Sequence, residues 1–102
     1  TGFYLEQTKD VVLTANGAIN AVYGITLWSM TNVILSSNGV FDSTYGISVW
    51  FSEYIQLLGN QVNTSDIGIV ARNTIALLIK NANYSSLNSG LHIITFDHFI
   101  LF

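Results

Sequence analysis

Few side chains in this sequence can do chemistry. It has six acids, two histidines and no cysteine, and its densest group of titratable residues is His92, Asp97 and His98. Imidazole and carboxylate groups can hold a metal ion or transfer protons. The two histidines fall on either side of a predicted bend, however, so we interpret this group as a surface or cap feature. We predict no metal site and no bound cofactor.

Composition excludes several classes of protein. Only three of the 102 residues are basic and the net charge is −3, whereas nucleic-acid binding needs clustered lysine and arginine to neutralise phosphates. Half of the residues are apolar, so disorder is excluded. The longest unbroken apolar run is residues 75–79, far shorter than the roughly 20 residues that span a bilayer. We therefore expect no nucleic-acid partner and no membrane span.

The elements that position these side chains follow from an internal repeat of 22 residues without insertions or deletions. Counted from its glycine as position 0, every unit is apolar at positions 1, 3, 9 and 11, for example Ile25, Leu27, Val33 and Leu35 in the second unit. A spacing of two within each pair is that of a β-strand with one face buried. Each unit therefore contains two predicted strands. The repeats start at Gly2, Gly24, Gly46, Gly68 and Gly90.

A turn and a third, looser strand complete each unit. Position 14 is Asn16, Asn38 and Asn60 in the first three units. Asparagine tolerates the left-handed conformation, bonds its own backbone, and can bond other asparagines stacked along the column. Position 16 is Ala18, Val40, Val62 and Tyr84, which indicates a third, weaker strand whose other positions are mixed.

Strands repeated in this way predict a coil that climbs by one strand spacing, about 4.8 Å, per unit. The expected fold class is all-β, a single-stranded parallel β-helix (β-solenoid) of about five 22-residue coils. Right-handed winding is the usual preference. The absence of proline agrees, because every stacked strand has a neighbour that needs its N–H. We expect residues 1–102 to form one domain.

Two strings carry a resemblance to known repeats: YGITLWSMTNVILSSNG and YGISVWFSEYIQLLGN. They resemble the parallel β-helix repeats of pectate lyases, phage tail spikes, carbohydrate-active surface proteins and the copper-associated NosD family. The resemblance covers the whole chain and implies an architecture that many functions share. The NosD likeness also implies a role with copper. The chain departs from the usual pattern by placing large apolar groups at outward positions, where Asn and Ser are more usual.

Two outward positions carry side chains suited to contact with a partner. Position 10 includes Val12, Ile34 and Leu78, and position 4 places Trp28 and Trp50 on adjacent coils. Exposed aliphatic stripes are uncommon on soluble monomers, and the tryptophans could hold the faces of a sugar ring. We predict lateral or ligand contacts at these five residues. The alternative is a flattened coil, or a side loop of a longer natural chain that covers them.

One pair of acids has a spacing that an enzyme could use. Glu53 and Asp97 share position 7 two coils apart, with Ile75 between them, which separates them by about 9.6 Å. That distance suits an inverting glycosidase. A solvated face explains the pair equally well, and no catalytic or phosphate-binding motif is present. We predict no catalytic residues and no enzymatic activity.

Two sequons stand on the loose third side, at Asn63 and Asn83. They are candidate glycosylation sites, although such triplets arise by chance in a chain rich in Asn, Ser and Thr. Their use requires secretion by a glycosylating cell.

Both ends of the chain carry ordinary repeat residues rather than a cap. An open coil exposes strand edges over an apolar core, so we expect copies of the chain to stack head to tail, which builds a filament rather than a ring. The predicted function is a structural, self-associating subunit of an extracellular filament or surface scaffold. The alternative is a segment of a carbohydrate-binding or carbohydrate-processing β-helix, and a designed sequence without an evolved ligand stays open. The predicted self-assembly interface is Thr1, Gly2, Phe3, Leu5, Phe99, Ile100, Leu101 and Phe102.

Overall fold

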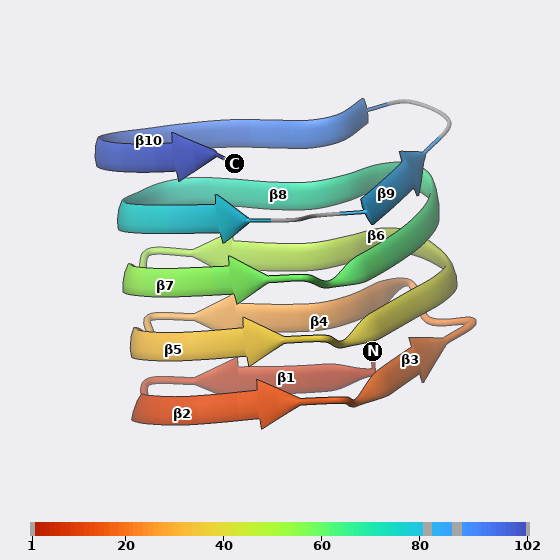
Figure 1. The fold of residues 1–102 in the computed structure, drawn as a ribbon, viewed down its shortest axis with the longest axis horizontal. Coiled ribbons are helices and arrows are strands. Elements are labelled where there is room, and N and C mark those ends of the chain that lie inside the picture. The colour runs from red at the N-terminus through yellow and green to blue at the C-terminus, as the bar shows by residue number, and fades with distance from the viewer. Residues whose placement is uncertain (1, 81–82, 87–88, 102) are drawn as a thin grey trace.

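The computed structural model describes the backbone of residues 2–80, 83–86 and 89–101, and the side chains up to Lys80 except that of Ser65. Within these ranges it contains ten strands and no helix. Figure 1 shows the strands as successive turns of one coil, each lying on the turn before it. The strands are β1 (Phe3–Glu6), β2 (Lys9–Thr14), β3 (Gly17–Ile19), β4 (Tyr23–Trp28), β5 (Thr31–Ser36), β6 (Gly39–Trp50), β7 (Glu53–Leu58), β8 (Gln61–Lys80), β9 (Asn83–Ser86) and β10 (Ser89–Leu101).

The predicted parallel β-solenoid is confirmed by the pairing of the strands. Every pairing is parallel, and Ile25 of β4 pairs with Ile47 of β6, which pairs with Ile69 of β8. The offset of 22 residues is interrupted only locally, between Phe41 and Tyr45 in β6 and between residues 94 and 97 in β10. In Figure 1 the chain runs rightward along the nearer strands β2, β5 and β7 and leftward along β1 and β4 behind them while it climbs. This is a right-handed coil.

The core is a set of apolar ladders along the axis of the coil. Side chains at repeat positions 1, 3, 9 and 11 of the inner coils are at most 1% exposed. The looser third strand adds Ala18, Val40 and Val62, which are 5%, 0% and 1% exposed. Burying these columns removes apolar surface from water at each layer, which is the main stabilising contribution. The fully buried ladder residues are Ile25, Leu27, Val33, Leu35, Ile47, Val49, Ile55, Leu57, Ile69, Ala71, Leu77 and Ile79.

Left-handed backbone conformations mark the corners of the coil, at repeat positions 5, 8, 13 and 18. The turn after the second strand has its positive φ at Ala15 (56°), Ser37 (56°) and Gly59 (62°). The prediction that the asparagine at position 14 adopts this conformation was therefore wrong by one residue. The asparagine instead turns its side chain into the corner, where it bonds to neighbouring coils.

The predicted asparagine ladder is confirmed. The Nδ2 of Asn16 donates to Oδ1 of Asn38 at 3.2 Å, and the Nδ2 of Asn38 donates to Oδ1 of Asn60 at 3.1 Å. Asn38 and Asn60 are only 2% exposed. The same Oδ1 of Asn60 also accepts the backbone N–H of Asn38 at 3.0 Å, so the ladder satisfies backbone groups that the turn removes from the sheet.

Hydroxyl side chains have the same role at two other corners. The backbone N–H of Met30 donates to Oγ of Ser52 at 3.0 Å, and that of Ala21 donates to Oγ of Ser43 at 3.2 Å. The Ser52 hydroxyl in turn donates to the carbonyl of Trp50 at 2.9 Å. Each of these corners is therefore bonded through a side chain of the coil that follows it. These two corners were not predicted from the sequence.

Candidate functional site: an aromatic groove

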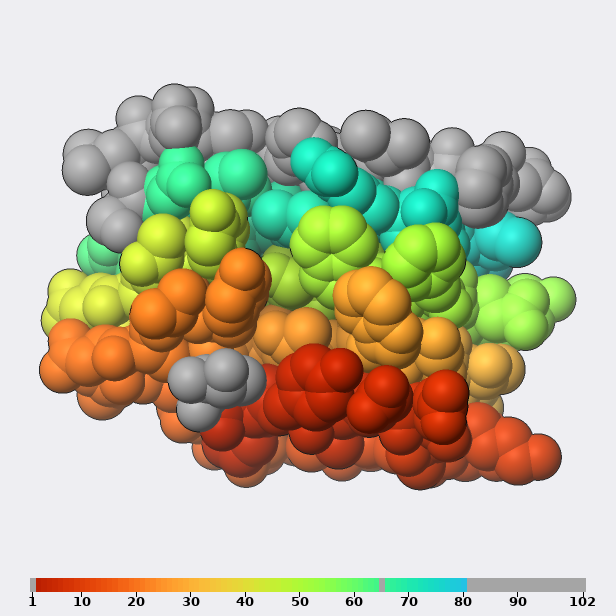
Figure 2. All heavy atoms as spheres, turned by 180° about the vertical axis from the view of Figure 1, so that it is seen from behind, coloured from red at the N-terminus to blue at the C-terminus, as the bar shows by residue number. Residues whose placement is uncertain are grey.

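The candidate site lies on the outer face of one side of the coil. This face is formed by β1, β4, residues 45–50 of β6 and residues 67–72 of β8, which pair in that order. Figure 2 shows it from behind, with the side chains of successive coils lying on one another as bands of colour. Because positions 1 and 3 point into the core, positions 2 and 4 point outward. Position 21, before the glycine, departs from this alternation, and its Tyr23 is 42% exposed.

Two columns of aromatic rings flank this face. Trp28 and Trp50 stack with their ring centroids 5.9 Å apart and an interplanar angle of 28°. Tyr23 and Tyr45, at position 21, stack at 5.0 Å and 14°. Stacked aromatic pairs on neighbouring strands stabilise a sheet and hold each other's rotamers. The two columns are therefore firm walls along the axis of the coil.

The tryptophan column has a different charge at each end. Glu6, which is exposed, pairs in register with Trp28 on one side. Arg72 lies on the other side with its guanidinium carbon 5.5 Å from the centroid of the Trp50 ring, a cation–π distance. The column thus has an acidic end and a basic end.

Between the walls, the floor consists of small side chains at position 2. Thr26, Ser48 and Val70 point outward, yet they are only 7%, 1% and 5% exposed. Wider side chains stand beside them, which are aromatic at Thr26 and Ser48 and are Ile67 and Arg72 at Val70. The hydroxyl Oγ1 of Thr26 is buried without a hydrogen-bond partner. A buried unpaired hydroxyl costs about 1–3 kcal/mol, so this group is a candidate contact for a bound ligand.

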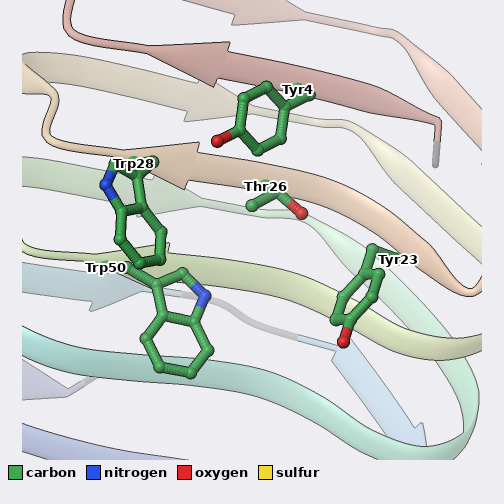
Figure 3. Close-up of a pocket in the computed structure, with 5 residues that line it drawn as sticks. All are labelled: Tyr4, Tyr23, Thr26, Trp28 and Trp50. Carbon is green, nitrogen blue, oxygen red and sulfur yellow. The ribbon is translucent and has the colours of Figure 1, made fainter.

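Thr26 stands at the base of a hollow of about 340 Å³. Figure 3 shows it in the middle of a ring of aromatic side chains, with Tyr4, Trp28, Trp50 and Tyr23 around it. This volume is at the small end of the range of ligand pockets.

A second hollow of about 190 Å³ continues the first along the axis, between Tyr45 and Arg72 and above Ser48. Trp50 and Tyr23 line both hollows, so the two form one groove, which we call the aromatic groove.

A tyrosine–aspartate pair stands beside the groove. The Asp66 carboxylate raises the pKa of the Tyr45 phenol above its ordinary value, and partial burial and the neighbouring Tyr23 act in the same direction. Negative charge beside a phenol disfavours the phenolate. Ionisation of Tyr45 is therefore harder than that of an ordinary tyrosine.

The structure brings together only some of the residues predicted from the sequence as contact sites. Trp28 and Trp50 form one wall of the aromatic groove. Val12, Ile34 and Leu78 share an outward column on the β2–β5–β7–β8 side, where Val12 is 62% exposed and the other two are half-buried. Their role as a lateral contact stays a prediction.

The remaining predicted sites fall partly outside the described side chains. Gly2 is exposed, and Phe3 and Leu5 are half-buried. Asn63 is exposed on β8. Thr1 and Phe102 lie outside the described residues, and so do the side chains of Phe99, Ile100, Leu101, Asn83, His92, Asp97 and His98.

The backbone register confirms one relationship among the predicted acids. Both Glu53 and Asp97 pair with Ile75, from opposite sides, so they stand in one column two coils apart.

The residues of the groove that were not predicted include Tyr4, Tyr23 and Tyr45 of its walls and Thr26, Ser48 and Val70 of its floor. The signal for the tyrosine wall was the recurrence of tyrosine one residue before the glycine in two successive units. The sequence gives no comparable signal for the side chains of the floor, because the alternation of inward and outward residues along a strand predicts that position 2 is exposed.

Fold and groove together define a right-handed parallel β-solenoid with an aromatic outer face. Comparison with known families gives a more specific result. The family model described as periplasmic copper-binding protein (NosD) matches residues 1–99. The chain therefore belongs to the NosD family, as its resemblance to these repeats implied. No curated protein and no solved structure matches the chain significantly. In the part of the chain that the structure describes, no helix is long and apolar enough to cross a membrane.

The described side chains do not fit a copper site. Copper in proteins is bound by histidine nitrogen and by cysteine or methionine sulfur. The sequence has no cysteine, and its one methionine, Met30, is 1% exposed within the core. Among the side chains described, no three His, Cys, Asp or Glu residues form a group that could hold a metal ion. The aromatic groove is the candidate site that the described residues define by their stacked rings and its buried hydroxyl.

Proposed function

We propose that this NosD-family solenoid is a carbohydrate-binding protein that holds a sugar chain along the aromatic groove. The observation that carries the proposal is the arrangement of two aromatic walls around a floor with an unpaired, buried hydroxyl at Thr26. A sugar ring has apolar C–H faces and polar hydroxyl edges, so it matches a site that offers ring faces beside a hydrogen-bonding group. Few convergent polar groups in a mostly apolar hollow are typical of ligand sites.

The shape of the groove favours a chain of sugars over a single one. Trp28, Trp50, Tyr23 and Tyr45 repeat from one coil to the next, and Ser48 repeats the place of Thr26 one coil further on. Successive coils therefore offer similar contacts at a spacing of about 4.8 Å. A polymer that lies along the axis can use these contacts together, which raises its affinity over that of one unit.

A glycan array of soluble oligosaccharides, followed by isothermal titration calorimetry with the bound glycans, tests the proposal. We expect longer oligomers to bind more tightly than their monosaccharide. Replacing Trp50 by Ala should weaken binding by about tenfold or more, because the ring lines both hollows.

Tyr54→Ala is the matched control for the tryptophan variant. Tyr54 is 58% exposed and stands in β7, away from the groove, so its loss removes an exposed aromatic ring without altering the walls. An array without bound glycan, or equal loss of binding in both variants, would contradict the proposal.

We also propose self-association as a second function. Val12 is 62% exposed, and Phe3 and Leu5, whose counterparts in the inner coils are fully buried, are only half-buried. Apolar surface of this kind favours contact with another copy. Light scattering over a dilution series measures the outcome: growth of long particles with concentration supports head-to-tail stacking, and a monomer at high concentration excludes it.

The two proposals share a location. Because the family is described as periplasmic, we propose that the protein acts outside the cytoplasm, in the periplasm or at the cell surface. The groove has no assigned catalytic step, so the proposed function is binding.

A further inference from the structure

We infer that the sugar chain held by the aromatic groove carries protonated amino groups, so that the preferred ligand is a polymer of amino sugars. This inference rests on the proposed carbohydrate binding and specifies its ligand class. Three observations carry it: the aromatic lining of the larger hollow, the acid next to Trp28 on the same face of the sheet, and the acceptor at the base of the hollow.

The lining is suited to a cation. Tyr4, Tyr23, Trp28 and Trp50 surround the larger hollow, and a positive charge over aromatic faces is stabilised by their quadrupoles, most strongly for tryptophan. The structure already contains one cation–π contact of this kind, because the Arg72 guanidinium carbon lies 5.5 Å from the centroid of the Trp50 ring. In the larger hollow, on the side of Trp28, no side-chain cation is among the lining residues.

Charge next to Trp28 favours the same ligand. Glu6 is exposed and pairs in register with Trp28, so it stands on the same face of the sheet, next to Trp28 and outside the residues that line the hollow. The chain as a whole has a net charge of −3, which attracts polycations and repels polyanions at low ionic strength. Arg72 lies at the opposite end of the tryptophan column, so a cationic ligand has a preferred position at the Glu6 end.

The base of the hollow supplies the hydrogen-bonding partner. Oγ1 of Thr26 is buried and unpaired, and a hydroxyl oxygen accepts hydrogen bonds from N–H and O–H donors. A primary ammonium group offers three such donors, whereas a quaternary ammonium offers none. The aromatic lining and the threonine together thus favour a primary amine on a hydroxylated ring.

A matched pair of probes tests the inference: the β-1,4-linked hexamers of glucosamine and of glucose, which differ in an amino or a hydroxyl group on each ring. Isothermal titration at about pH 6, where aliphatic amines are protonated, should show the glucosamine hexamer binding about fivefold to tenfold more tightly at low salt. Added sodium chloride should reduce this difference, because screening weakens charge interactions.

Glu6→Gln should lower the affinity for the glucosamine hexamer by roughly threefold and leave that for the glucose hexamer unchanged. Glu53→Gln is the matched control, since it removes the same charge at the start of β7, outside the groove. Both replaced acids are at the surface or half-buried, and the unfolding midpoint of each variant verifies its fold.

The outcomes separate this inference from the proposed function. Equal binding of the two hexamers, or failure of the glucosamine hexamer to bind, overturns the inference, while any neutral glycan bound on the array still supports carbohydrate binding. An array without bound glycan removes the proposed function and the inference together. A loss of glucosamine-hexamer affinity in Glu53→Gln equal to that in Glu6→Gln would show a general effect of net charge and would also overturn the inference.

Discussion

A Cβ atom on Gly24 would stand 2.8 Å from the carbonyl oxygen of Gly46 in the next coil, closer than real Cβ contacts. It would also collide with the side chain of Val40. Gly46 has the same relationship to Gly68 and Val62, and none of these glycines is among the residues with positive φ. The repeated glycine therefore lets the first and third sides of the coil approach closely at this corner.

Gly46→Ala should reduce the free energy of unfolding by about 1–3 kcal/mol, because the added methyl group must displace backbone or the Val62 side chain. Urea unfolding followed by circular dichroism measures the change. Gly17→Ala is the matched control, since its Cβ would meet only the Gly39 carbonyl oxygen, at 3.8 Å. Equal stability of the two variants would show that the close approach is not what requires glycine.

Asn60→Ala should cost about 1–3 kcal/mol of folding free energy, because it leaves the buried N–H of Asn38 without an acceptor. It also removes the bond from Asn60 Nδ2 to the carbonyl of Leu35 at 2.9 Å. The exposed Asn63, replaced by Ala, provides the comparison within the same chain. Denaturant midpoints of the two variants that coincide would contradict an energetic role for the asparagine ladder.

Thr26→Val should leave the protein as stable or make it more stable by up to about 1 kcal/mol, because it replaces an unpaired buried hydroxyl with a methyl group. The same change should weaken glycan binding, since the floor loses its hydrogen-bonding group. Thermal unfolding and calorimetric titration of one preparation measure both effects. A variant that loses more than about 1 kcal/mol of stability would indicate that the hydroxyl has a structural partner.

Tyr45 should ionise above the ordinary pKa of 10.0, and Asp66→Asn should bring its pKa back toward that value. Because the pKa is raised in the folded state, the linked stability is fully present below about pH 10 and is lost as the pH rises through the folded pKa. The difference in phenolate absorbance between the protein and its Tyr45→Phe variant isolates this one tyrosine. An unchanged titration in Asp66→Asn would exclude the carboxylate as the cause.

Much of the fold could be predicted from the spacing of apolar residues. The columns that contain Ile25 and Leu35 recur every 22 residues, and a strict period of two within each pair leaves little choice but stacked strands. The backbone conformation of the corners was harder to predict from the sequence. Ala15 and Ser37 have the left-handed conformation. Neither alanine nor serine is typical of that conformation, so the sequence points instead to the asparagine that follows each of them.

The groove was only half predicted, for a different reason. Trp28 and Trp50 stand out in any outward column, whereas Thr26 and Ser48 occupy positions that alternation makes exposed. Their burial depends on the width of the aromatic rings on both sides and on the coils above and below. This burial arises only when neighbouring coils pack together, so the residue pattern of one strand does not predict it.

The bonding of three of the corners through side chains of the following coil has a consequence for how the protein can change over generations. A whole unit is the smallest segment whose duplication or loss keeps every column aligned, since a smaller change would move Asn38 away from Asn60. Duplicating the unit that contains Tyr45 and Trp50 would add one more step to the groove and leave the other layers intact. If the groove binds sugar chains as proposed, the length of chain that it holds would then evolve in steps of one coil.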